Sequence, residues 1–156
     1  MRKANRIGEK KHVDFGRFHE KKFTFLKDWR IVRYYIKRKY GLSQSDLDVL
    51  LFLYDEHRFT KETFFEFSNT MQWSPRRFDI MQEKGFIVVW REKNEVANRK
   101  ALYELATTSK LLVAGVYKKL LGEEKISENT SVNPIMRGDT YTDRVYRMAI
   151  RKMNKR

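Results

Sequence analysis

Two adjacent arginines, Arg76 and Arg77, are the side chains whose type and position could do the most chemistry in this sequence. They follow Ser74 and Pro75, and this pair is typical of a helix start, because serine caps the first turn and proline fits the first helical position. An outward guanidinium can donate two hydrogen bonds to a guanine edge, a contact of about 1–3 kcal/mol in base discrimination. Ser74, Arg76, Arg77 and Gln82 are therefore the candidate base contacts.

A second group of cations lies between two short apolar runs. Residues 86–90 (FIVVW) and 101–105 (ALYEL) are rich in β-branched and aromatic side chains, so the sequence predicts a hairpin with a long charged tip. Such a tip can reach the backbone or minor groove beside a helix that lies in a major groove. The candidates in this hairpin are Arg91, Lys93, Asn98, Arg99 and Lys100.

The third group forms a basic N-terminal arm over residues 1–22, with Arg2, Lys3, Arg6, Lys10 and Lys11 as candidate phosphate contacts. Residues 1–40 hold 14 Lys and Arg against 4 Asp and Glu, residues 41–126 hold 13 of each, and residues 127–156 hold 7 against 3. The net charge of +14 therefore lies in two flanks around a neutral middle. Like charges repel within about 8–10 Å, so this layout favours a polyanion, of which nucleic acid is the commonest.

Apolar periodicity predicts the first helix, over residues 25–41. Its expected inner face comprises Leu26, Trp29, Val32, Ile36 and Tyr40. Arg30, Arg33 and Lys37 form a second stripe, which is equally consistent with a solvated face and with a phosphate-facing one.

Short polar side chains mark the next helix starts. Ser43 with Asp46 predicts a capped helix that runs to about Glu56, and Thr60 predicts a short helix that fades near Asn69. The aromatic residues expected in the core are Phe64, Phe65, Phe67, Trp29, Trp73 and Trp90.

Beyond the hairpin, Thr107 or Thr108 is expected to cap a helix that ends before Gly122. Residues 123–139 are polar and contain Asn133-Pro134, so they are predicted to be a linker. A last basic helix is expected from Tyr141 to about residue 153. Its predicted apolar edge comprises Tyr141, Val145, Met148 and Ala149.

The fold class predicted from these elements is mostly α with a small β-hairpin. The order of three helices, a capped helix, a hairpin and a further helix is that of a winged helix-turn-helix. Four segments are expected: a basic arm over 1–22, a winged-helix domain over 23–122, a linker over 123–139 and a basic C-terminal helix over 140–156.

Over residues 26–121 the chain resembles the MarR-type transcriptional regulators. The resemblance rests on residues 41–47 (GLSQSDL), 83–87 (EKGFI), 98–100 (NRK) and Leu105 with Thr107 or Thr108. It implies that Arg99 enters the minor groove and that Arg76 and Arg77 contact the major groove. It also implies a dimer formed through residues 25–40, 108–121 and 140–153.

Several functions lack the residues that they need. The absence of cysteine excludes disulfides, thiolate zinc sites and thiol nucleophiles, and no glycine-rich phosphate loop occurs. His12, His19 and His57 lack carboxylates at ligand spacing, so no catalytic site, metal or cofactor is predicted. With no signal peptide and no membrane span apparent, an intracellular, nucleoid-associated location is expected.

Two functional hypotheses follow. The first is a DNA-binding transcriptional regulator, dimeric, whose basic flanks supply phosphate affinity and whose winged domain reads bases. The alternative is a structural, assembly or polymerase-associated protein, for example of a phage, that uses the winged domain for protein contacts and the arms for nonspecific nucleic-acid binding. Binding of RNA through the arms ranks lower, because no aromatic and basic sheet signature is visible.

Overall fold

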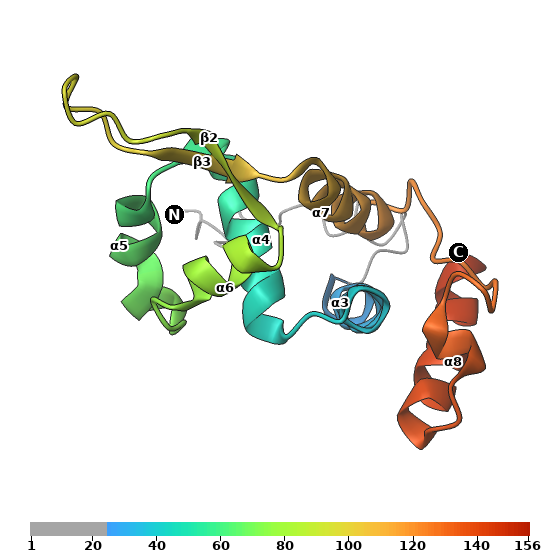
Figure 1. The fold of residues 1–156 in the computed structure, drawn as a ribbon. Coiled ribbons are helices and arrows are strands. Elements are labelled where there is room, and N and C mark those ends of the chain that lie inside the picture. The colour runs from blue at the N-terminus through green and yellow to red at the C-terminus, as the bar shows by residue number, and fades with distance from the viewer. Residues whose placement is uncertain (1–24) are drawn as a thin grey trace, which may run out of the picture.

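The computed structural model describes residues 25–156, and in this part of the chain six helices surround a small antiparallel sheet (Figure 1). The predicted class, mostly α with a small β component, is confirmed. In chain order the elements are α3 (Phe25–Tyr40), α4 (Gln44–Glu56), β1 (Arg58–Phe59), α5 (Lys61–Met71), α6 (Arg77–Glu83), β2 (Ile87–Arg91), β3 (Leu102–Leu105), α7 (Thr107–Leu120), the 3-10 helix η1 (Pro134–Arg137) and α8 (Tyr141–Asn154).

The sheet has the strand order β1-β3-β2 and is antiparallel throughout. The predicted hairpin is β2 and β3, in which Ile87 is opposite Leu105 and an irregularity falls between Val89 and Arg91. The two-residue strand β1 was not predicted. Residues 92–101, here called the hairpin tip, extend away from the body of the molecule (Figure 1).

Local capping fixes two helix starts as predicted. The Ser43 hydroxyl accepts the Asp46 N–H at 3.1 Å while the Asp46 carboxylate accepts the Ser43 N–H, which is a complete capping box. Thr60 caps α5 through the Thr63 N–H.

The two other predicted caps are wrong. Helix α6 begins at Arg77, because Ser74 accepts the Arg76 N–H in a preceding turn instead of capping the helix. The N-cap of α7 is Ala106, without a side-chain hydrogen bond.

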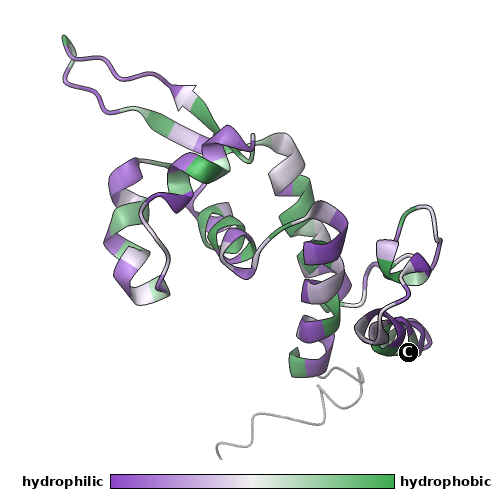
Figure 2. Cartoon of the chain, turned by 60° about the horizontal axis from the view of Figure 1, so that its bottom comes forward, coloured by the Kyte–Doolittle hydropathy of each residue, from purple (hydrophilic) through white to green (hydrophobic). Residues whose placement is uncertain are grey.

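One hydrophobic core surrounds α4, and Figure 2 shows apolar residues lining the inner sides of the helices. Phe64 stacks on Trp73 with 5.0 Å between ring centroids, and Phe78 packs edge-on against Phe64 at 5.5 Å and Tyr103 at 5.0 Å. These contacts tie α5 and α6 to the hairpin. The predicted burial of Phe64 and Trp73 is confirmed, and Phe78 is buried beside them.

Three aromatic residues predicted in the core lie at the surface instead. Phe65 and Phe67 of α5 are 43% and 41% exposed, because only Phe64 and Ser68 of that helix turn fully inward. Trp90 is 43% exposed, and the Arg58 guanidinium lies 3.6 Å from its ring centroid. The apolar side chains of these residues predicted burial. In the structure, Phe65 and Phe67 lie on solvent-facing positions of the short helix α5, and Trp90 lies at the irregularity of strand β2.

The segment predicted as a linker is packed into the fold. Ile126, Ile135 and Met136 are buried, and the fully buried Asn133 donates to the Ser127 carbonyl while its Oδ1 accepts the Ile135 N–H. These contacts hold η1 against the body and position the start of α8.

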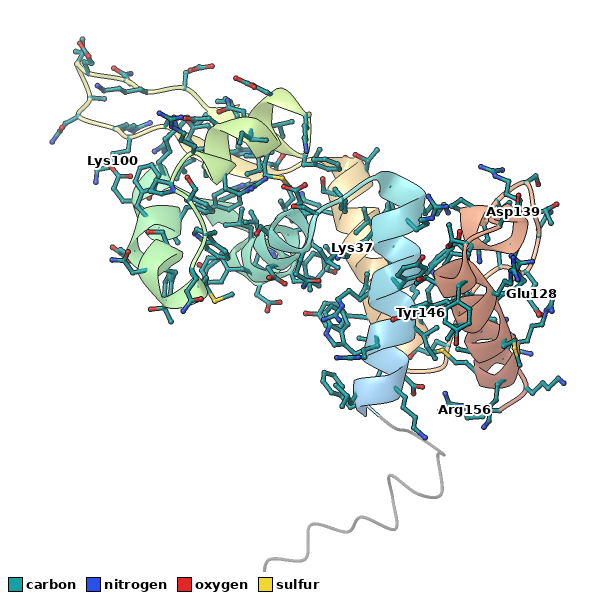
Figure 3. The ribbon with its side chains drawn as sticks, turned by 90° about the horizontal axis from the view of Figure 1, so that it is seen from below. Lys37, Lys100, Glu128, Asp139, Tyr146 and Arg156 are labelled. Atoms are coloured by element: carbon teal, nitrogen blue, oxygen red, sulfur yellow. The ribbon has the colours of Figure 1, made fainter. Side chains whose placement is uncertain are left out.

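Helix α8 packs on α3 through the face opposite the predicted edge. Tyr141, Val145 and Met148 are exposed, whereas Asp143 and Ile150 are buried. Tyr146 points toward α3, where its ring stacks on Tyr34 with 3.9 Å between centroids (Figure 3). The apolar pattern predicted the wrong face because the inner face of α8 contains a buried carboxylate. The Asp143 carboxylate accepts hydrogen bonds from the Tyr34 hydroxyl at 2.8 Å and from Arg38 at 3.0 Å.

Candidate nucleic-acid interface

The Asp46 carboxylate links the start of α4 to α6. It is 1% exposed, and it accepts from Arg77 Nη1 at 2.9 Å and from Lys84 Nζ at 3.4 Å. Burial alone would raise the pKa of Asp46, but hydrogen bonds from Ser43 and the charge of Lys84 hold it below the ordinary 3.8. Two cations, Arg77 at the start of α6 and Lys84 just after it, therefore share one carboxylate within the fold.

This contact changes what Arg77 offers to a ligand. Its side chain is 25% exposed and its Nε is buried without a hydrogen-bond partner among the described residues. Arg77 was predicted to point outward, but the structure uses it to fasten α6 to α4. Removing it from that site would leave the buried Asp46 carboxylate with one cation fewer.

The outward side of α6 is short and close to neutral. The helix has seven residues. Arg76 and Ser74 are exposed and Gln82 is half-buried, while the Asp79 carboxylate pairs with Lys61 at 3.2 Å. Arg76 makes no ion pair within residues 25–156, so among the candidates of this group it is the cation available to a ligand.

Most predicted cations of the hairpin also have internal partners. Arg91 Nη2 donates to the Lys100 carbonyl at 3.1 Å, which braces the base of the tip. Lys93 lies 3.3 Å from Glu95, and Lys100 lies 3.4 Å from Glu62 of α5. Both of these ion pairs are exposed, so solvent screens them and a phosphate could compete for either lysine.

Arg99 differs from its neighbours in the tip. Its backbone pairs with Asn94 in both directions, at 2.8 and 3.0 Å, which closes the turn at the end of the hairpin. Asn98 precedes it with φ of 51°, a left-handed conformation that asparagine tolerates well. The Arg99 side chain is exposed and has no ion pair in the part of the chain that the structure describes.

The remaining predicted groups lie apart from α6 and the hairpin. Arg2, Lys3, Arg6, Lys10 and Lys11 of the arm lie outside the described residues. Arg30 of α3 is exposed, Arg33 lies 5.8 Å over the Trp29 ring and Lys37 is half-buried, so this stripe faces solvent. The cations of α8 lie at the opposite end of the molecule from the hairpin tip (Figure 1).

Sequence reasoning missed Arg58, whose guanidinium stacks on Trp90 on the open side of the sheet. The short strand β1 that carries it has no periodicity to reveal it. It also missed the pairing of Asp46 with Arg77, although the capping pattern did single out Asp46. An ion pair between residues far apart in the chain, such as Asp46 and Arg77, produces no regular spacing that a single sequence could reveal.

No known protein family, curated protein or solved structure matches this chain. Within residues 25–156, no group of three His, Asp or Glu side chains is placed to hold a metal ion. In the same part of the chain, every helix is too short or too polar to cross a bilayer.

Proposed function

We propose that this protein is a DNA-binding transcriptional regulator of the winged-helix type. The element order from α4 to β3, with the sheet order β1-β3-β2 and a protruding hairpin, supports the proposal because it matches the layout in which one helix and one hairpin share a duplex. The observation that carries it is the hairpin tip, which stands clear of the body (Figure 1) and contains Arg99, an exposed residue with no ion pair within residues 25–156.

Phosphate attraction dominates in this proposal, and base reading is limited. Arg77 and Lys84 are engaged by Asp46, so α6 presents Arg76 beside Asp79 and Glu83. Such a helix reads few base edges, whereas the net charge of +14 supplies sequence-independent affinity. The hairpin then adds a contact with the flanking backbone or minor groove.

Selection of bound sequences from a random duplex pool tests the proposal. The full chain is expected to enrich a short common site, and a fluorescent duplex with that site should stay bound against a hundred-fold excess of random duplex. Arg76→Ala is expected to reduce the preference for the site more than the affinity for random duplex. Failure to enrich any site would refute the regulator.

A second candidate is an assembly or polymerase-associated protein. The observation that favours it is the exposure of large apolar side chains on α5, where Phe65, Phe67 and Met71 are each more than 40% exposed. Exposed large apolar groups are more typical of a protein interface than of a phosphate-facing surface. Under this hypothesis the selection yields no common site, and Phe65→Ser with Phe67→Ser leaves duplex binding unchanged while it abolishes binding of the protein partner.

Dimerisation through α3, α7 and α8 belongs to the same proposal. Leu26 of α3 and Leu111 of α7 are 65% and 68% exposed, so both helices offer apolar side chains to a second copy of the chain. Sedimentation equilibrium should give twice the chain mass of 19.0 kDa at micromolar concentration. Leu111→Glu should then shift the mass toward the monomer.

A further inference from the structure

A pocket of about 330 Å³ lies between α3, α7 and the segment 124–132. It contains no residue of α5, α6 or the hairpin, so it is separate from the candidate DNA-binding surface. The side chains that matter for its chemistry are Tyr35, Tyr40, Lys39, Lys118, Lys119 and Lys125, together with Glu124.

The pocket holds four ammonium groups and one carboxylate, and within residues 25–156 only Lys119 of the four lysines forms an ion pair. Lys119 is 7% exposed and donates to Glu124 Oε1 at 2.8 Å. Lys39, Lys118 and Lys125 are exposed, and none of them forms an ion pair within residues 25–156. The unpaired charge at the pocket is therefore strongly positive.

The surroundings of Glu124 show how closely these cations gather. The hydrogen bond from Lys119 lowers the pKa of Glu124. Burial opposes this effect, and the charges of Lys119, Lys118 and Lys39 lower the pKa further. Lys39 and Lys119 both lie 5.7 Å from the Tyr35 ring centroid. Like charges held this near one another repel unless an anion lies between them.

The geometry points to a binding site for a small polyvalent anion that carries phosphoryl groups. A concave site with a buried lysine, three exposed lysines and tyrosine rings in its lining can surround a free phosphoryl group, and its volume fits a small ligand. Nucleic acid carries the same groups on a broad convex surface, which fits such a pocket poorly. This inference does not depend on the proposed DNA binding.

Titration of the full chain with inorganic pyrophosphate in a calorimeter tests the site. One saturable site per chain is expected. Lys39→Gln and Lys118→Gln should each weaken binding about five-fold, because each removes a charge-assisted contact at a partly exposed position. Lys110→Gln and Lys152→Gln each remove one positive charge at a position outside the pocket. These two control variants should change the affinity for pyrophosphate less than two-fold.

A second variant tests the cavity without changing any charge. Gly115 lines the pocket, and a Cβ at this position would meet only Lys119 Nζ, at 3.5 Å, so a larger side chain can be built into the open space. Gly115→Leu is expected to keep the thermal unfolding midpoint within a few degrees and to weaken pyrophosphate binding more than ten-fold.

Three results would overturn the assignment. Equal weakening by the pocket variants and by Lys110→Gln and Lys152→Gln would mean that only overall charge matters. An unchanged affinity in a folded Gly115→Leu variant would place the anion elsewhere. If Lys39→Gln and Lys118→Gln weaken duplex binding as much as they weaken pyrophosphate binding, the phosphates that the pocket meets belong to nucleic acid and not to a free ligand.

Discussion

Arg77 donates a hydrogen bond to Asp46 at 2.9 Å across 31 positions of sequence. The contact joins the N-terminus of α4 to the first residue of α6, so it fixes the orientation of the helix that is proposed to meet DNA. Two neighbouring arginines therefore have different tasks: Arg76 faces solvent and Arg77 maintains the fold.

Alanine substitution should separate these tasks. Arg77→Ala is expected to lower the free energy of unfolding by about 1–3 kcal/mol, because it leaves the buried Asp46 carboxylate with Lys84 as its remaining ionic partner. Arg76→Ala should change stability by less than about 0.5 kcal/mol. Urea unfolding followed by circular dichroism measures both, and equal effects would show that Arg77 is not a fold contact.

Stability should fall in acid through Asp143. Burial alone would raise the pKa of Asp143, but hydrogen bonds from Arg38, Tyr34 and Thr140 hold it below the ordinary 3.8. A carboxyl group with a depressed folded pKa stabilises the fold above its unfolded pKa and loses that effect as the pH falls through the folded pKa. Wild type should therefore exceed Asp143→Asn by about 1–3 kcal/mol near pH 6 and by much less near pH 2.

The same network predicts a late tyrosine titration. Burial and the hydrogen bond to Asp143 raise the pKa of Tyr34 to about 12. The absorbance of the phenolate near 295 nm should therefore contain a component that appears only above about pH 11. This component should be absent in Tyr34→Phe, and Tyr141→Phe serves as the control because Tyr141 is 79% exposed.

Local signals carried most of what the sequence could predict. The Ser43 cap and the extent of α4 follow from neighbouring residues, and both are confirmed. The inner face of α8 could not be predicted, because Asp143 is buried by partners more than 100 positions away in α3. In the same way, Arg76 and Arg77 are equivalent in sequence, and only the distant Asp46 distinguishes them.

A glycine outside the regular elements should prove sensitive to substitution. A Cβ on Gly138 would lie 1.9 Å from Asp143 Oδ2, and that carboxylate accepts hydrogen bonds from Tyr34 and Arg38. Gly138→Ala should therefore cost about 1–3 kcal/mol. In an Asp143→Ala background the added cost should be small, since the clashing carboxylate is gone. Gly115→Ala, whose Cβ meets only Lys119 Nζ at an ordinary contact distance of 3.5 Å, is the control.

The salt dependence of duplex binding should identify the cations in contact. If about eight flank cations meet phosphates, log affinity should fall with log salt at a slope of magnitude near 7. Deletion of residues 1–22 should flatten it, and an unchanged slope would remove the arm from the interface.

Arg99→Ala should lower the same slope by about 1 if the hairpin tip meets the backbone. Lys110→Ala provides the control, because Lys110 pairs with Glu104 at 3.3 Å on the body of the molecule. Fluorescence anisotropy at several potassium chloride concentrations measures every slope. A fall of similar size in both variants would mean that Arg99 acts only through the net charge.

The placement of the hairpin and α8 at opposite ends of the molecule limits the path of any bound duplex (Figure 1). A duplex that touches the hairpin tip and the arginines of α8 at the same time must therefore run the whole length of the described part of the molecule. If the two ends instead hold separate stretches of DNA, the protein bridges them.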